Sequence, residues 1–281
     1  MSRTTFGSSR TVVTLFLAAG LLACLGLAGC RMQSQEIHKE AGRLEKIKAA
    51  GKIVVGTSAP YPPYEFHLLP ELSGDMVGID IDIAEAIAAG LNVRLEIKDI
   101  QFSRLFDELA AGNIDIALAG LAPTAARQRV VDFSIPYYQA IQNMLVRAAD
   151  KDKIRLLEDL RGKVVGTQKG SIQEDMARNL VSGATFFIHE DLNALVAALK
   201  AGQIDAVIVE KPVADTFAAR DAALLNLECN TDRLPLGSAA AVRKGDSELL
   251  ERVNAVLRKL IEAPKLTESI EAAKMLANKG C

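Results

Sequence analysis

Tryptophan is missing from the 281-residue chain, and aromatic residues make up only 5% of it. The three histidines, His38, His67 and His189, lie far apart, which excludes a zinc site built on H-x-x-x-H spacing. The sequence has no G-x-x-x-x-G-K-[ST] phosphate loop and no G-x-S-x-G nucleophile elbow. Neither sign of charge dominates, since 33 Lys and Arg face 35 Asp and Glu, and no basic cluster alternates with aromatics. We therefore expect no metal ion, no cofactor and no nucleic-acid partner.

The chain does contain a repeat. Hydrophobic residues make up 49% of it, which suits one or two globular domains. LAAGNIDIALA at residues 109–119 recurs as LKAGQIDAVIV at residues 199–209, and GKIVVGT at residues 51–57 recurs as GKVVGT at residues 162–167. Two matches in the same order predict two lobes of similar βα construction. Because open α/β sheets bind ligands at the carboxyl ends of their strands, we expect loops of the two lobes to face one another across a cleft.

The N-terminus has the layout of a secretory signal peptide, with arginines before an apolar run over residues 11–29. The run ends in L-A-G-C at Cys30, which resembles the bacterial lipobox, whose cysteine is acylated and becomes the new N-terminus. L-L-A-C at Cys24 is a weaker match, and an uncleaved membrane anchor is the alternative. We expect a signal peptide over residues 1–29, a tether over residues 30–40, and the rest of the chain outside the cytoplasmic membrane.

Processing at Cys30 would leave two further cysteines, Cys229 and Cys281. Export permits a disulfide between them, but a single pair is no disulfide framework. Two free thiols are the alternative, and the sequence leaves both open.

The first lobe offers a loop of small residues beside a guanidinium. Gly112 ends a helix, a strand follows over residues 114–118, and the loop around Gly120 is nearly bare of side chains. Thr124 has the position of an N-cap for a short helix whose first turn carries Arg127. A ligand can approach the backbone of such a loop closely.

Two aromatic residues follow strands of the same lobe. Tyr61 lies in a proline-stiffened loop after a strand over residues 52–56, and it is either held for a ligand or a surface tyrosine of a rigid connector. Phe102 follows a strand over residues 92–97 and is either a core residue or a ligand contact. Between them, Asp80 is expected to cap a helix.

The second lobe offers a helix start and a carboxylate. Ser171 opens a helix with a capping box that Glu174 completes. Free N–H groups at a helix start attract anions, although plain capping needs no ligand. A strand over residues 204–209 ends at Glu210, and Pro212 fits the first turn of the next helix. Glu210 therefore lies where a strand end meets the cleft, or is a solvated carboxylate near a helix N-terminus.

Together these residues suit a zwitterion that carries a side chain. Arg127 can hold a carboxylate through two parallel charge-assisted hydrogen bonds. Glu210 would take the ammonium group, and Tyr61 and Phe102 would flank the side chain. Because an unmatched charge in a closed cleft is costly, a ligand that lacks either charged end should be rejected.

At these residues the chain resembles the family 3 extracellular solute-binding proteins, the polar amino-acid receptors of ABC importers. The resemblance extends from about residue 44 to residue 276, and it rests on GTSAPYPPYEF, VGIDIDIA, IDIALAGLAPTAARQRVVDFSIPYY, GKVVGTQKGS and IDAVIVEKPVA. It implies an α/β fold, the type II periplasmic-binding-protein fold, with two lobes joined by two crossing strands. Lobe 1 would comprise residues 41–138 and 237–281, and lobe 2 residues 139–236.

The resemblance also implies roles for single residues. Arg127 falls on the arginine that binds the α-carboxylate, Tyr61 and Phe102 on the aromatic clamp, and Gly120 and Ser171 on backbone and hydroxyl contacts. The ligand-binding candidates are these residues, their loop neighbours and the strand end in lobe 2: Ser58, Tyr61, Phe102, Ala119, Gly120, Ala122, Arg127, Gln168, Ser171, Ile172 and Glu210.

Three candidates depart from the pattern of the family that the chain resembles. Glu210 stands where the family more often has Asp for the α-amino group, so the contact is tighter by one methylene or aimed differently. Ala122 stands where Ser or Thr usually adds a hydroxyl contact. Ser58 stands where members that select basic ligands can carry Asp, which weakens the case for arginine or lysine without excluding it.

The sequence thus predicts a monomeric, lipid-anchored receptor that is not an enzyme. It would capture an L-amino acid, polar or basic, and present it to a membrane permease driven by an ATPase. One alternative is an exported dehydratase of prephenate- or arogenate-like acids, with Glu210 as general acid if burial raised its pKa. Another is a sensor or adhesin domain, although no signalling module accompanies the lobes.

Overall fold

The computed structural model describes residues 42–68, 75–229 and 236–279. The expected signal peptide, the tether, Cys30 and Cys281 lie outside these residues. Cys229 lies buried as a free thiol, and burial raises its pKa to about 12. Within the three described segments, no helix has both the length and the apolar character needed to cross a membrane.

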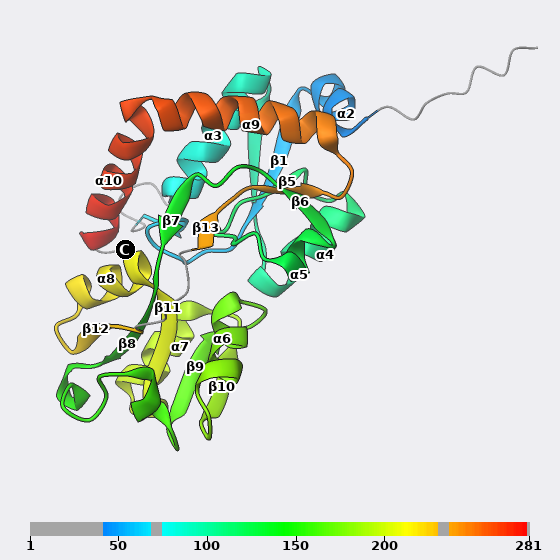
Figure 1. Ribbon diagram of the computed structural model, residues 1–281. Helices are drawn as coiled ribbons and strands as arrows, with labels where there is room; N and C mark the ends of the chain where they lie inside the picture. The colour runs from blue at the N-terminus through cyan, green and yellow to red at the C-terminus, as the bar shows by residue number, and fades with distance from the viewer. Residues whose placement is uncertain (1–41, 69–74, 230–235, 280–281) are drawn as a thin grey trace, which may run out of the picture. The chain divides into compact units, whose positions relative to one another are not determined.

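The first sheet has five strands in the order β4-β1-β5-β14-β6 (Figure 1). Its centre is parallel, because β1 (Lys52–Thr57) pairs with both β4 (Arg94–Asp99) and β5 (Ile116–Ala117) in that sense. The strand β14 (Ala241–Arg243) is antiparallel to β5 and to β6 (Val131–Phe133). This sheet therefore needs a strand from far along the chain to be complete.

The second sheet has the order β10-β9-β11-β8-β12. Its centre is parallel as well, since β9 (Val164–Gln168) pairs with β10 (Thr185–His189) and with β11 (Ala206–Glu210). The strand β8 (Gln142–Arg147) is antiparallel to β11 and to β12 (Leu224–Glu228). The two sheets match strand for strand, so the sequence repeat is a repeat of topology.

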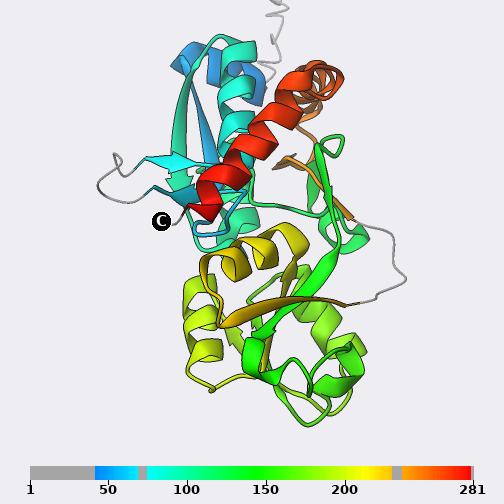
Figure 2. The same ribbon diagram turned by 90° about the vertical axis from the view of Figure 1, so that its left-hand side faces the viewer.

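Two short strands connect the sheets. The strand β7 (Tyr138–Ala140) leads into β8, and β13 (Leu236–Ser238) leads back towards β14; the two pair antiparallel. In Figure 2 the green ribbon of β7 and β8 runs as one extended stretch between the two lobes. A separate small hairpin pairs β2 (Phe66–His67) with β3 (Met76–Val77) in the first lobe.

Several helices end or begin as the residue pattern predicts. α2 (Arg43–Ala50) ends at Gly51 and α4 (Leu105–Ala111) at Gly112, both with positive φ (64° and 78°), a conformation that glycine adopts without strain. α5 (Ala125–Gln128) is capped by Thr124. The other described helices are α3 (Ile79–Leu91), α6 (Ile172–Leu180), α7 (Leu192–Lys200), α8 (Lys211–Arg220), α9 (Ser247–Glu262) and α10 (Pro264–Asn278), with 3-10 turns η2 (Phe102–Arg104), η3 (Ala148–Asp150) and η4 (Leu157–Leu160).

Both sheets are covered on two faces, as parallel sheets require. In the first lobe, apolar residues of α3 and α9 cover one face and those of α4 cover the other. In the second lobe, α7 and α8 cover one face and α6 the other. The buried core therefore lies along each sheet, and the strand ends are left for the site.

The two copies of the sequence repeat make the same packing contact. Gly56 in β1 lies against Ile114, and Gly166 in β9 lies against Ile204. A Cβ atom at these glycines would lie 2.5 Å and 2.6 Å, respectively, from the Cδ1 atom of the facing isoleucine. The missing side chain of each glycine thus leaves room for the isoleucine that lies just before the neighbouring strand, β5 in the first lobe and β11 in the second.

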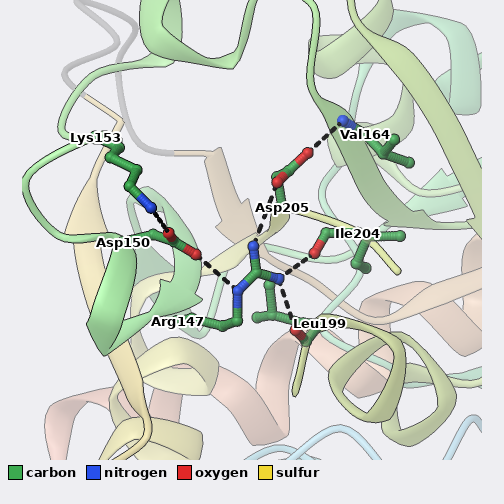
Figure 3. Close-up of polar contacts among 7 residues, drawn as sticks. All are labelled: Arg147, Asp150, Lys153, Val164, Leu199, Ile204 and Asp205. Carbon is green, nitrogen blue, oxygen red and sulfur yellow. Dashed lines mark hydrogen bonds and ion pairs between the residues drawn. The ribbon is translucent and has the colours of Figure 1, made fainter. Parts of the chain in front are cut away.

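In the second lobe, an arginine fixes the start of the strand that leads to the site (Figure 3). Arg147 donates hydrogen bonds to the carbonyl groups of Leu199 (2.8 Å) and Ile204, and its Nη2 atom lies 3.3 Å from Oδ1 of Asp205. The other oxygen of Asp205 accepts the N–H of Val164 at 2.9 Å. These bonds hold the residues just before β11, whose far end carries the carboxylate of the site.

The first lobe contains the same arrangement, built with an arginine from a different place in the chain. Arg43 in α2 donates through Nε to Asp115 and through Nη2 to the carbonyls of Gly112 (2.8 Å) and Ile114 (3.2 Å). Asp115 accepts the N–H of Val54 at 2.7 Å. The aspartate of each repeat therefore links two adjacent strands of its sheet. An arginine from outside the repeat donates hydrogen bonds to backbone carbonyls in the turn before that aspartate.

Candidate functional site

Tyr61 is held by the turn that follows β1. Its N–H donates to the carbonyl of Glu65 at 2.7 Å, and its own carbonyl accepts the N–H of Tyr64 at 2.9 Å. The rings of Tyr61 and Tyr64 stack with centroids 5.6 Å apart. The loop is thus a folded turn that holds the Tyr61 side chain inside the molecule, and the alternative of a surface tyrosine is wrong.

The small-residue loop around Gly120 comes close to that tyrosine. Gly120 has φ +54°, and a Cβ atom there would lie 3.3 Å from Cε1 of Tyr61, so both conformation and space favour glycine. The Gly120 N–H donates to Oδ2 of Asp80 at 2.7 Å. The loop therefore has a fixed conformation, although it has few side chains.

Asp80 has a different role from the predicted one. The residue at the N-cap of α3 is Gly78, and Asp80 lies in the first turn, fully buried. Its carboxylate accepts hydrogen bonds from the N–H of Gly120 and from the hydroxyl of Tyr137 (2.7 Å), and burial raises its pKa to about 6. The expectation was wrong because α3 begins at Ile79, so Asp80 lies inside the helix and not at the capping position. Its hydrogen-bond partners come from other parts of the fold.

Arg127 lies in α5, where Thr124 caps the helix as predicted by accepting the Arg127 N–H at 3.3 Å. The guanidinium donates to the carbonyls of Ala122 and, in the other lobe, Gly170, both at 3.2 Å. It lies over the ring of Phe102 at 5.5 Å, a cation–π geometry. Burial lowers its pKa to about 10, so the side chain stays charged at neutral pH.

In the second lobe, the end of β9 and the start of α6 form the opposite wall. Ser171 is the N-cap of α6, and its Oγ atom accepts the N–H of Glu174 at 3.1 Å. In the expected capping box, the Glu174 carboxylate would accept the N–H of Ser171. It accepts the N–H of the preceding residue, Gly170, at 2.9 Å. Gln168 is held by its side-chain bond to the carbonyl of Glu190 (3.0 Å).

Glu210 ends β11 and is 2% exposed, so the alternative of a solvated carboxylate is wrong. Its Oε2 atom accepts a hydrogen bond from the hydroxyl of Tyr64, in the first lobe. Burial raises its pKa to about 7, and the nearby carboxyl of Asp80 raises it too, whereas Tyr64 and the charge of Arg127 favour the ionised form.

Nine of the eleven candidates line one pocket: Tyr61, Phe102, Ala119, Gly120, Arg127, Gln168, Ser171, Ile172 and Glu210. Ser58 and Ala122 do not line it, although both are buried and Ala122 supplies a carbonyl to Arg127. Opposite charges from the two lobes therefore meet in one small cavity.

Gln173 also lines the pocket and was missed by the sequence reasoning. It is 6% exposed, and its amide nitrogen donates to Oε1 of Gln142 at 2.8 Å. The residue follows Ser171 by two positions in the first turn of α6. A polar side chain beside a predicted ligand-facing helix start was the available signal.

Comparison with known proteins identifies the family of the chain. The model of the bacterial extracellular solute-binding proteins, family 3, matches residues 53–272. The chain belongs to this family. Its architecture is accordingly the two-lobed type II periplasmic-binding-protein fold predicted above.

Three relatives of this solute-binding protein illustrate the family. An arginine-binding extracellular protein of Bacillus subtilis (strain 168) is 35% identical over 243 residues, covering 85% of this chain and 89% of that protein. A glutamine-binding protein of Geobacillus stearothermophilus is 33% identical over 245 residues, covering 82% and 91%. The crystal structure of an amino acid ABC transporter substrate-binding protein from Streptococcus pneumoniae Canada MDR_19A, bound to L-arginine, superposes with a TM-score of 0.81 at 35% identity, covering 84% and 100%.

These relatives are binding proteins, and this solute-binding protein is likewise not an enzyme. The raised pKa of Glu210 is the property that the dehydratase alternative required. Burial is the largest cause of that shift, and buried carboxyls have raised pKa values in structural settings too, so the shift alone does not indicate catalysis.

Proposed function

We propose that the protein is the lipid-anchored substrate-binding component of an ABC importer and captures an L-amino acid, polar or basic, between its lobes. It would deliver the ligand to the membrane permease, which a cytoplasmic ATPase drives. The observation that carries this proposal is the meeting of Arg127 and Glu210 in one pocket, each contributed by a different lobe.

In this proposal each end of the ligand has a partner. The guanidinium of Arg127 binds the α-carboxylate, and the carboxylate of Glu210 binds the α-ammonium. The rings of Tyr61 and Phe102 flank the side chain, and the backbone around Gly120 and the start of α6 supply the remaining polar contacts. Ser58 and Ala122 contribute through the shape of their loops.

The charge of the region favours a cationic side chain among the candidate ligands. Glu65 is fully buried, and burial followed by the charges of Asp80 and Asp99 raises its pKa well above the usual range. Glu65 and Asp80 lie outside the pocket, but each interacts electrostatically with Glu210, so the carboxyls in and beside the site outnumber the one guanidinium of Arg127. A ligand with a second positive charge would stabilise their ionised forms. The names of the arginine-binding relatives point the same way.

The location follows from the N-terminus. We propose that the signal peptide ends at residue 29 and that Cys30 carries the acyl chains, so that a monomeric two-lobed body with its boundaries near residues 138 and 237 lies on the outer face of the membrane. The intact mass of the processed protein tests this, since an unmodified N-terminal cysteine would contradict the anchor.

The ligand is tested with a thermal-shift panel of the common L-amino acids on the full-length protein in detergent. A ligand that binds only the folded state raises the melting temperature. We expect a shift with a polar or basic amino acid, and its loss in Arg127→Ala. Arg129→Ala is the matched control, because Arg129 is exposed two residues away and the same charge is removed. Shifts that survive in Arg127→Ala, or no shift with any amino acid, would refute the proposal.

A further inference from the structure

One hydroxyl of the site region has no role in the binding scheme above. Tyr64 is fully buried, and its hydroxyl crosses from the first lobe to the carboxylate of Glu210 in the second. It does not itself line the pocket. Its hydroxyl therefore donates to the residue proposed to hold the ligand ammonium, from a position outside the pocket.

The Tyr64 ring is fixed from several directions. It stacks on Tyr61 and meets the edge of Tyr138 with ring centroids 5.7 Å apart. Its carbonyl accepts the N–H of Asp80 at 2.9 Å. A Cβ atom at Gly78 would lie 2.2 Å from that carbonyl oxygen, so only glycine allows the helix start to pack here. The hydroxyl is thus presented from a rigid support.

Glu210 needs such a support more than an aspartate would. It lies at the N-cap position of α8 but makes no side-chain capping bond that would orient it. A glutamate has one more rotatable bond than an aspartate, and fixing that bond costs conformational entropy. With one oxygen held by Tyr64, the carboxylate keeps acceptor capacity for an ammonium group.

We propose that Tyr64 is a positioning residue, whose hydroxyl aims the Glu210 carboxylate at the ligand ammonium. The longer glutamate side chain and the tyrosine hydroxyl act as a pair that spans the cleft. This inference rests on the proposed function, because it takes Glu210 as the ammonium partner. It adds a residue outside the pocket that acts on ligand affinity through Glu210.

A double-mutant cycle tests the pairing, with L-arginine as the probe and calorimetry on the full-length protein in detergent. Tyr64→Phe keeps the ring and removes the hydroxyl; we expect it to weaken binding about tenfold or more, the usual effect of losing a hydrogen bond to a charged group. In a Glu210→Asp background the shorter side chain no longer reaches the hydroxyl, so Tyr64→Phe should change affinity less than about threefold.

The control is Tyr138→Phe, which removes the hydroxyl of a partly buried tyrosine whose ring touches Tyr64 and should change affinity less than about twofold. An unchanged affinity in Tyr64→Phe would overturn the inference. An equal loss in the parent and in the Glu210→Asp background would overturn it as well, because the hydroxyl would then act independently of the carboxylate.

A second readout needs no ligand and separates this inference from the proposed function. The hydroxyl of Tyr64 favours the ionised form of Glu210, whose other neighbours are Asp80, Arg127 and Gln142. A carbon-13 titration of the Glu210 carboxyl should therefore show a higher midpoint in Tyr64→Phe than in the parent. No movement of the midpoint would sink the pairing even if ligands bind, whereas a moved midpoint with no ligand binding would sink the proposed function alone.

Discussion

The buried carboxyl of Glu210 should make the stability of the free protein depend on pH. Its pKa is raised from an ordinary value of 4.5 to about 7, mainly by burial. The folded chain therefore binds this proton more tightly than the unfolded chain, and the free energy of unfolding falls as pH rises from 4.5 to 7. At about 1.36 kcal/mol for each pH unit between these values, the loss approaches about 3 kcal/mol above pH 7.

Glu210→Gln removes this loss, because the amide is neutral at every pH and keeps nearly the same shape. We expect the difference in free energy of unfolding, variant minus parent, to increase by about 2 to 3 kcal/mol between pH 5 and pH 8. Urea denaturation followed by circular dichroism, in the absence of amino acids, measures the difference. The other buried carboxyls titrate in both proteins, so the subtraction removes most of their contribution and leaves that of Glu210 together with its coupling to Asp80 and Glu65.

Glu251→Gln is the matched control, since Glu251 is exposed on α9 and the chemical change is the same. Its difference from the parent should stay flat over this pH range. Parallel stability curves for Glu210→Gln and the parent would refute the reasoning. A parent whose free energy of unfolding increases relative to the variant as pH rises would also refute it, because Glu210 would then be ionised and well paired in the free protein.

Two further substitutions test what supports the site. Gly120→Ala should lower the melting temperature and weaken amino-acid binding about tenfold, because φ is +54° and the new Cβ would lie 3.3 Å from Tyr61. Gly202→Ala is the control, since φ is +73° there and nothing lies within 4 Å of the new Cβ. It should lower the melting temperature without changing affinity. Arg147→Met should lower the free energy of unfolding by about 2 kcal/mol, because two carbonyls and two carboxylates lose a partner, whereas exposed Arg155→Met should have little effect in the same urea titration. Binding unchanged in Gly120→Ala, or equal effects of the two arginine substitutions, would contradict these explanations.

Local patterns allowed much of the fold to be predicted. The glycines at 51 and 112 end helices because they adopt positive φ, and Thr124 and Ser171 cap helices because a short oxygen-bearing side chain reaches an exposed N–H. Arg127 and Glu210 were predictable for a similar reason, since Glu210 ends a strand and Arg127 lies in the short helix after a loop that follows a strand. The repeat also predicted two lobes of the same construction.

Long-range partners could not be predicted in this way. Asp80 looked like a cap but accepts hydrogen bonds from Gly120 and Tyr137, residues 40 and 57 positions away. The Tyr64 hydroxyl meets Glu210 across 146 positions, and no local pattern records that distance. Gln173 faces the pocket only because α6 packs with that side inward.

By itself the sequence determined the strand and helix order, the two-lobed plan and the charged pair, because these depend on residues near one another in the chain. Only the tertiary structure decided how deeply Glu210 is buried, and hence that its pKa lies near 7, because burial depends on which distant segments cover a side chain. It also decided that equivalent aspartates in the two lobes are held by arginines from non-equivalent places, Arg43 in a helix and Arg147 in a strand. Packing needs a guanidinium at a point in space, and any segment that passes that point can supply it.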